Sequence, residues 1–210
     1  MSDQQEKLEA LRQAVARIEE EEPAEAASSS GESPAAPSGK EDGRSDYDRA
    51  KAVVLRKLTG SAKSRHQLAE ALREREFGEG TIAEVLDRMQ EVHLLDDAEF
   101  ARTWVRTRHE LKNLGRAALR RELKEKGIDE ALAEEALEQI GSEDEDAAAR
   151  ELVAKKLQGK TLPVGDGPEE RKERDKHTRR LVSMLARRGH PPGAAFQIVR
   201  EALDEHTAGR

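Results

Sequence analysis

The chain has 210 residues, of which 39% are charged, 35% apolar and only 2% aromatic. The composition is typical of helical proteins with thin cores and excludes a single large core. The chain contains no cysteine, which excludes disulfides, thiolate nucleophiles and cysteine-based metal sites. We find no apolar run suited to a transmembrane helix or a signal peptide, so we expect a cytoplasmic protein without membrane contact.

Residues 1–45 are predicted to form a disordered acidic tail. This stretch carries five basic and eleven acidic side chains, and Glu, Pro, Ala, Ser and Gly make up most of it. Such a segment cannot bury enough apolar surface to offset the entropy of ordering. The rest of the chain, with 32 basic and 33 acidic residues, is close to neutral.

Nine helices are predicted after the tail from the period of the apolar residues. Capping boxes are expected where Ser64, Thr81 and Ser142 are each followed three residues later by Gln or Glu. The expected helices cover about 47–59, 65–76, 81–92, 97–112, 116–126, 129–140, 143–157, 174–188 and 192–205.

The helices fall into three sets of three, because one pattern occurs three times. Each copy has two leucines four residues apart, then a turn, then a second apolar stripe. The aligned copies are 65–89, 116–140 and 178–202. This pattern predicts an all-α fold of three tandem three-helix repeats in an elongated array. The expected repeats are 46–95, 96–142 and 143–206, the last with an inserted loop near 158–173.

Residues suited to catalysis are not found in this sequence. Gly159-Lys160-Thr161 resembles the end of a phosphate-binding loop, but Ala154 stands where the opening glycine should be. The six histidines show no pair at metal-ligand spacing on one helix. Paired carboxylates lie at helix starts or on solvated faces, where they are poorly suited to acid–base chemistry. We therefore expect a binding protein with no enzymatic activity, no cofactor and no metal.

Basic side chains gather in two regions. Residues 102–126 hold nine basic and three acidic residues, and residues 171–188 hold eight and two. Arginine suits phosphates or the carboxylates of an acidic protein surface, although any one of these residues could equally belong to a solvated face. The candidate partner-binding residues are Arg102, Arg106, Arg116, Arg120, Lys124, Arg179, Arg180, Arg187 and Arg188. Packing roles are expected for Trp104, Phe77, Phe100 and Phe196.

Several of these segments are similar to the RecX family of bacterial regulatory proteins. The resemblance lies in VHLLDDAEFA from Val92 to Ala101, the RTRH that follows, and LGRxxLxxELxxKGI from Leu114 to Ile128. LRKLTGSAKSRHQLAEAL and LARRGHPPGAAFQIVREAL resemble the flanking repeats of that family. The resemblance covers about 46–205. Glu76 and His93 stand where the family often has glycine, which leaves the form of those two turns open.

The resemblance implies three three-helix repeats and a role in regulating the RecA recombinase. A member would bind in the groove of the RecA–single-stranded-DNA filament and lower its ATPase, strand-exchange and co-protease activities, with consequences for DNA repair, recombination and the SOS response. The residues alone leave two other functions open: a helical DNA-binding module that acts without RecA, and a scaffold for another acidic partner. We expect a monomer that reaches single-stranded DNA through the filament.

Overall fold

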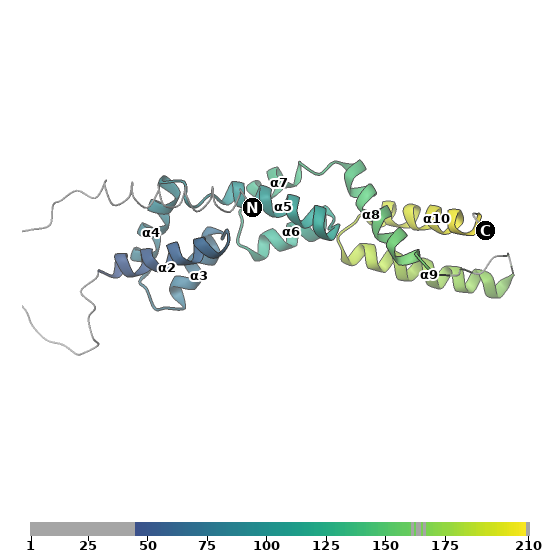
Figure 1. Cartoon of the computed structure of the whole chain (residues 1–210), viewed down its shortest axis with the longest axis horizontal. Coiled ribbons are helices and arrows are strands. Elements are labelled where there is room, and N and C mark those ends of the chain that lie inside the picture. The colour runs from purple at the N-terminus through teal and green to yellow at the C-terminus, as the bar shows by residue number, and fades with distance from the viewer. Residues whose placement is uncertain (1–44, 161, 163–164, 166, 209–210) are drawn as a thin grey trace, which may run out of the picture. The chain divides into compact units, whose positions relative to one another are not determined.

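The computed structural model describes residues 45–160, 162, 165 and 167–208, and nine α-helices lie within these residues (Figure 1). The acidic tail predicted for residues 1–45 lies, apart from Ser45, outside the described residues. None of the described helices is long and apolar enough to cross a membrane. The chain divides into two compact units, and the boundary between them in the sequence falls between Asp96 and Asp97.

The first unit contains the first three-helix repeat, formed by α2 (Asp46–Gly60), α3 (Arg65–Arg73) and α4 (Glu79–Glu91). Its core confirms the expected apolar pattern, because the α3 leucine pair and the α4 stripe are fully buried. The buried residues of these two helices are Leu68, Ala69, Ala71, Leu72, Ile82, Val85, Leu86 and Met89. Val54 of α2 closes the third side of this core.

The predicted capping boxes differ in outcome. Ser64 caps α3, because its side chain accepts from the Gln67 amide while the Gln67 side chain accepts from the Ser64 amide. The box predicted at Thr81 is wrong, since α4 begins two residues earlier with Gly78 as its N-cap. An acidic residue, Glu79, occupies the first turn of α4, where it complements the partial positive charge of the helix start.

The second unit holds the other two repeats. In the second repeat α5 (Asp97–Lys112), α6 (Arg116–Glu125) and α7 (Glu130–Leu137) surround a core that includes the predicted leucine pair and stripe. In the third repeat α8 (Ser142–Leu157) packs against α10 (Pro192–Ala208), and α10 packs along α9 (Pro168–Arg187) (Figure 1). The buried pair Leu181 and Leu185 anchors α9 in this core.

Two predictions for the third repeat are wrong. The loop expected near 158–173 ends earlier, because α9 begins at Pro168. Proline suits the first helical position, since its fixed φ is already helical and its missing N–H would have no helical partner there. Phe196, expected to pack, is instead 53% exposed on α10.

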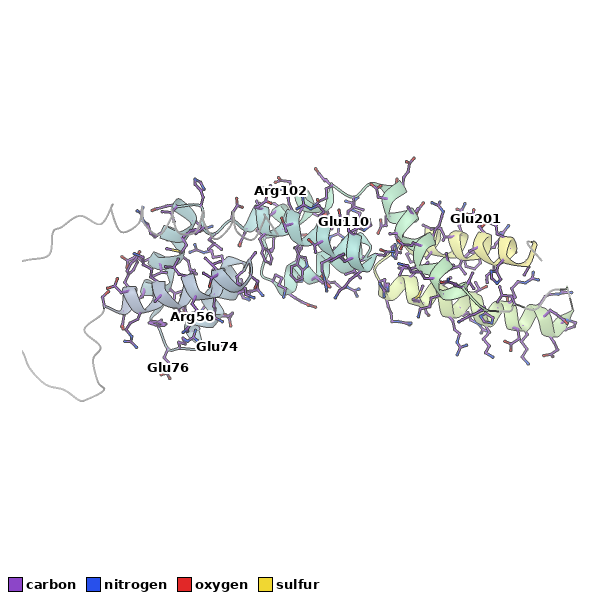
Figure 2. The ribbon with its side chains drawn as sticks, in the orientation of Figure 1. Arg56, Glu74, Glu76, Arg102, Glu110 and Glu201 are labelled. Carbon is purple, nitrogen blue, oxygen red and sulfur yellow. The ribbon has the colours of Figure 1, made fainter. Side chains whose placement is uncertain are left out.

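The second helix of every repeat ends in the same turn. A residue two or three positions after the last helical residue adopts a left-handed backbone, at φ 63° for Glu76, 69° for Gly127 and 87° for Gly189. The next amide then donates to a leucine carbonyl: Phe77 to Leu72, Ile128 to Leu123, and His190 to Leu185. This is the Schellman arrangement of a helix C-terminus. Glu76 therefore keeps the turn without glycine, and it projects outward after α3 (Figure 2).

Candidate functional site

The N-terminus of α6 is capped entirely by groups of the third repeat. The Gly115 amide donates to the Arg188 carbonyl at 2.9 Å and the Ala117 amide to the Gly189 carbonyl at 3.3 Å. Between them, the Arg116 amide donates to the Glu145 carboxylate at 2.8 Å. The first amides of a helix have no acceptor within that helix, so these three bonds supply the acceptors that the first amides of α6 need. They also fasten the second repeat to the third.

The capping box predicted at Ser142 is wrong. The sequence predicts Ser142 as the N-cap of α8 and Glu145 as its capping-box partner. In the structure Gly141 is the N-cap, and the Asp144 side chain accepts from the Gly141 amide. Glu145 is instead only 6% exposed and points at α6. A buried carboxylate beside the positive end of a helix is held by charge and by a hydrogen bond together.

Two glycines allow the repeats to approach this closely. A Cβ on Gly115 would lie 2.6 Å from the Gly189 carbonyl oxygen, and a Cβ on Gly189 would lie 2.2 Å from the Ala118 amide nitrogen. Neither position can hold a larger residue unless the backbone shifts. Gly189 carries the further constraint of its positive φ.

Asn113 and His190 form the polar centre of this junction. The Asn113 side chain donates to the Ala148 carbonyl and, at 2.8 Å, to the Glu151 carboxylate. His190 is 3% exposed, and its Nε2 lies 3.0 Å from the Asn113 carbonyl oxygen. Because that oxygen can only accept, Nε2 carries the proton. Burial lowers the pKa of His190, although the bond to Asn113 opposes the shift.

The predicted cations of α5 and α6 have different surroundings. Arg102, on α5 in Figure 2, pairs with Glu99 and Glu135, and Arg120 pairs with Glu134. The Arg120 hydrogen bond lowers the pKa of Glu134. Arg116 is half-buried and lies near the same carboxylate. The ion pairs of Arg102 and Arg120 therefore link α5 and α6 to α7, and Arg116 adds only charge attraction to Glu134.

Arg106 and Lys124, by contrast, are exposed and have no ion pair or hydrogen-bonded side chain within the described part of the chain.

The predicted cations of α9 also divide into two kinds. Arg188 is half-buried, and its guanidinium donates to the Lys112 carbonyl, so it belongs to the junction. Arg179 is exposed, with Nε directed to the Asp175 carbonyl of its own helix. Arg180 and Arg187 are exposed, and no side-chain partner of either is found among the described residues.

The junction brings part of these two groups together. Arg121 of α6 donates to the Arg187 carbonyl at 3.5 Å, so the middle of α6 lies beside the C-terminal end of α9. Lys124 lies one turn beyond Arg121, and Arg180 lies two turns before Arg187. These four residues form what we call the basic strip: Arg121, Lys124, Arg180 and Arg187. Glu125, also exposed, lies beside it on α6.

Arg121 was missed by the sequence analysis. Its neighbour Arg120 fits the four-residue spacing that selected Arg116 and Lys124, but Arg120 is the one that pairs with Glu134. The missed signal was the position of Arg121 three residues before Lys124 on the same helix.

Trp104 packs inside the second repeat, as expected. Its ring stacks on Phe100 with 5.7 Å between centroids, and its indole N–H donates to Glu122 at 2.9 Å. Arg108 and Lys126 lie over the ring at 5.2 and 4.9 Å. Arg108 also bonds to Glu122 and, more than any other group, lowers the pKa of that carboxylate. These cations engage the ring face through cation–π attraction.

The fold and this junction define a helical protein built of three-helix repeats, two of which are joined end to end. Two family models match the chain: the first three-helix domain of RecX over residues 50–89, and the second over residues 96–137. The regulatory protein RecX of Streptomyces coelicolor is 46% identical over 162 residues, which cover 77% of this chain and 81% of that protein. RecX of Thermobifida fusca is 42% identical, with 75% and 80% covered.

The fold is also similar to that of solved RecX structures. The crystal structure of RecX from Lactobacillus salivarius matches with a TM-score of 0.61 at 21% sequence identity, over 74% of this chain and 96% of that one. The chain belongs to the RecX family of regulatory proteins.

Proposed function

We propose that this protein binds the RecA–single-stranded-DNA filament and mainly inhibits its ATPase, strand-exchange and co-protease activities. It would thereby regulate DNA repair, recombination and the SOS response. Membership of the RecX family supports the regulatory role. The observation that carries the proposal is the basic strip, which combines cations from two repeats that the junction holds together.

The strip suits a repetitive anionic partner. Arg121 and Lys124 project from α6, and Arg180 and Arg187 from α9, without competing salt bridges among the described residues. Guanidinium groups that pair with no carboxylate can donate paired N–H bonds to phosphate or carboxylate oxygens in forked geometry. Because backbone hydrogen bonds fix α6 against the end of α9, part of the orientational entropy of binding is already lost in the free protein.

The first experiment is a titration of this protein into the matching RecA on single-stranded DNA, with DNA-dependent ATP hydrolysis as the readout. Inhibition at protein concentrations well below that of RecA would support action on filament growth or stability. No inhibition, or inhibition that disappears when bare DNA is added in excess, would contradict the proposal.

The second experiment tests the strip. The double variant Arg121→Glu/Lys124→Glu should raise the concentration needed for half inhibition about tenfold, since two attractive contacts become repulsive. Lys156→Glu/Arg56→Glu is the matched control, because both residues are exposed on other helices and form no ion pair among the described residues. Equal inhibition by the two variants would show that the strip is not part of the interface.

The exposed strip gives a better test than the predicted set of Arg116, Arg120 and Lys124. Reversing Arg120 would place its new carboxylate against Glu134, so lost activity could reflect a loosened α6–α7 contact.

The alternative function is a DNA-binding module that acts without RecA. The strip favours it, because its cations form no ion pair among the described residues and a row of such residues can contact a phosphate backbone of any sequence. It predicts binding to bare single-stranded DNA that weakens steeply with salt, together with no effect on RecA beyond competition for the strand.

A further inference from the structure

A cleft of about 370 Å³ opens within the second unit, beside the junction of the second and third repeats. It is lined by the end of α5, by α6 and α8, and by the residue that follows α9. The lining residues are Arg108, Leu111, Lys112, Asn113, Leu114, Glu122, Leu152, Lys155 and Arg188. The cleft shares no lining residue with the basic strip, although both depend on the same junction.

One wall of the cleft is apolar and open to solvent. Leu111, in the last turn of α5, is 77% exposed, whereas the neighbouring Leu114 and Leu152 are half-buried and buried. Leucines with this range of exposure form an accessible apolar surface that continues into the packed interior. A bulky apolar side chain placed against Leu111 would remove both surfaces from water, which is favourable.

The rest of the rim is cationic. Lys112, Lys155 and Arg188 line the cleft together with Arg108. The lining carboxylate Glu122 is already engaged by Arg108 and Trp104, and the nearby Glu151 is engaged by Lys155 and Asn113. The bond from Arg108 lowers the pKa of Glu122, and the bond from Lys155 lowers the pKa of Glu151. Glu122 neutralises Arg108 and Glu151 neutralises Lys155, so the positive field that a docked group would meet comes from Lys112 and Arg188.

From this combination we propose that the cleft binds an acidic peptide segment of a partner protein, in which one bulky apolar side chain is flanked by carboxylates. The apolar side chain lies against Leu111 and Leu114, and the carboxylates face Lys112 and Arg188, which pair with no carboxylate among the described residues. A nucleic acid fits less well, because no aromatic ring lines the cleft on which a base could stack. This site goes beyond the proposed function, since it needs neither DNA nor a filament.

The test uses the full chain and a short fluorescent peptide of Asp and Glu with one central Phe, followed by anisotropy at low salt. We expect saturable binding by the parent. Replacing the peptide Phe by Ser, or Leu111 by Ser in the protein, should each weaken binding about tenfold, because most of the anchoring apolar contact is lost. Leu111→Ser should fold normally, since the side chain is mostly exposed; circular dichroism checks this.

Matched controls separate the cleft from general electrostatic attraction. Lys112→Gln should weaken binding roughly threefold at low salt, whereas Lys156→Gln, an exposed lysine of α8 outside the cleft, should not. Phe196→Ser, which alters another exposed apolar residue, should also bind normally.

Parent-like affinity in Leu111→Ser, or equal binding of the Phe and Ser peptides, would overturn the proposal. If an oligonucleotide displaced the peptide and Leu111→Ser had no effect on peptide binding, the cleft would be a phosphate site instead. The assay contains no RecA, so its failure is distinct from failure of filament inhibition.

Discussion

Removal of the Glu145 carboxylate should loosen the start of α6 and its attachment to the third repeat. The carboxylate accepts the Arg116 amide at 2.8 Å while only 6% exposed. A hydrogen bond to a charged group contributes about 1.5–3 kcal/mol, and a carboxylate near a helix start adds up to about 1 kcal/mol. Burial of the charge offsets part of this gain, so we expect Glu145→Ala to cost about 2 kcal/mol.

Native-state hydrogen exchange at the Arg116 amide measures this effect locally. A loss of about 2 kcal/mol corresponds to roughly 30-fold faster exchange when local opening is limiting. Glu145→Gln keeps an acceptor without the charge and should lose about half of that free energy. Glu143→Ala is the control, because Glu143 is exposed in the same turn of α8. If the Arg116 amide exchanged in Glu145→Ala as slowly as in the parent, the cap would contribute nothing and the reasoning would be refuted.

Two further predictions concern the turn at Glu76 and the titration of His190. Glu76→Gly should raise the free energy of unfolding of the first unit by about 0.5–1 kcal/mol, because glycine adopts a positive φ without the Cβ penalty. Urea unfolding measures this change. The control Glu74→Gly should destabilise the unit instead, because φ of Glu74 is −56°. Burial lowers the pKa of His190 from 6.5 in the folded state, so the unfolded chain binds more protons just below that pH and stability should fall on acidification. The facing groups include Glu145, which opposes the shift, and His109 and Arg188, which add to it. His190→Gln should therefore lose less stability than the parent between about pH 7.5 and 5.5, and an equal loss would assign the pH dependence to other groups.

The helices and the core residues could be predicted from the sequence, because both depend on the local period of the apolar residues. All three leucine pairs and their following stripes are buried where the spacing placed them. Helix ends were less certain, since a cap is decided by a few atoms. Ser64 formed its predicted box, but at Thr81 and Ser142 a preceding glycine took the N-cap position.

The candidate site could be predicted only in part, because charge along the chain does not show which cations pair across helices. Arg102 and Arg120 fit the spacing of a binding face, yet carboxylates of α7 engage both. Arg121 gained its importance from contact with Arg187, 66 residues away. The placement of Glu145 against α6 likewise depends on two repeats meeting, which no local pattern encodes.

The bonds that join α6 to the third repeat also determine how this protein responds to ionic strength. Gly115 and Ala117 bond to carbonyl oxygens, two glycines pack closely, and Glu145 is shielded from solvent. Added salt screens exposed charges but has little effect on uncharged backbone bonds or buried groups. The spacing between the α6 and α9 cations should therefore stay constant while their attraction for a partner declines. A salt titration of binding would then report the number of ionic contacts made, without a simultaneous change in the shape of the surface that makes them.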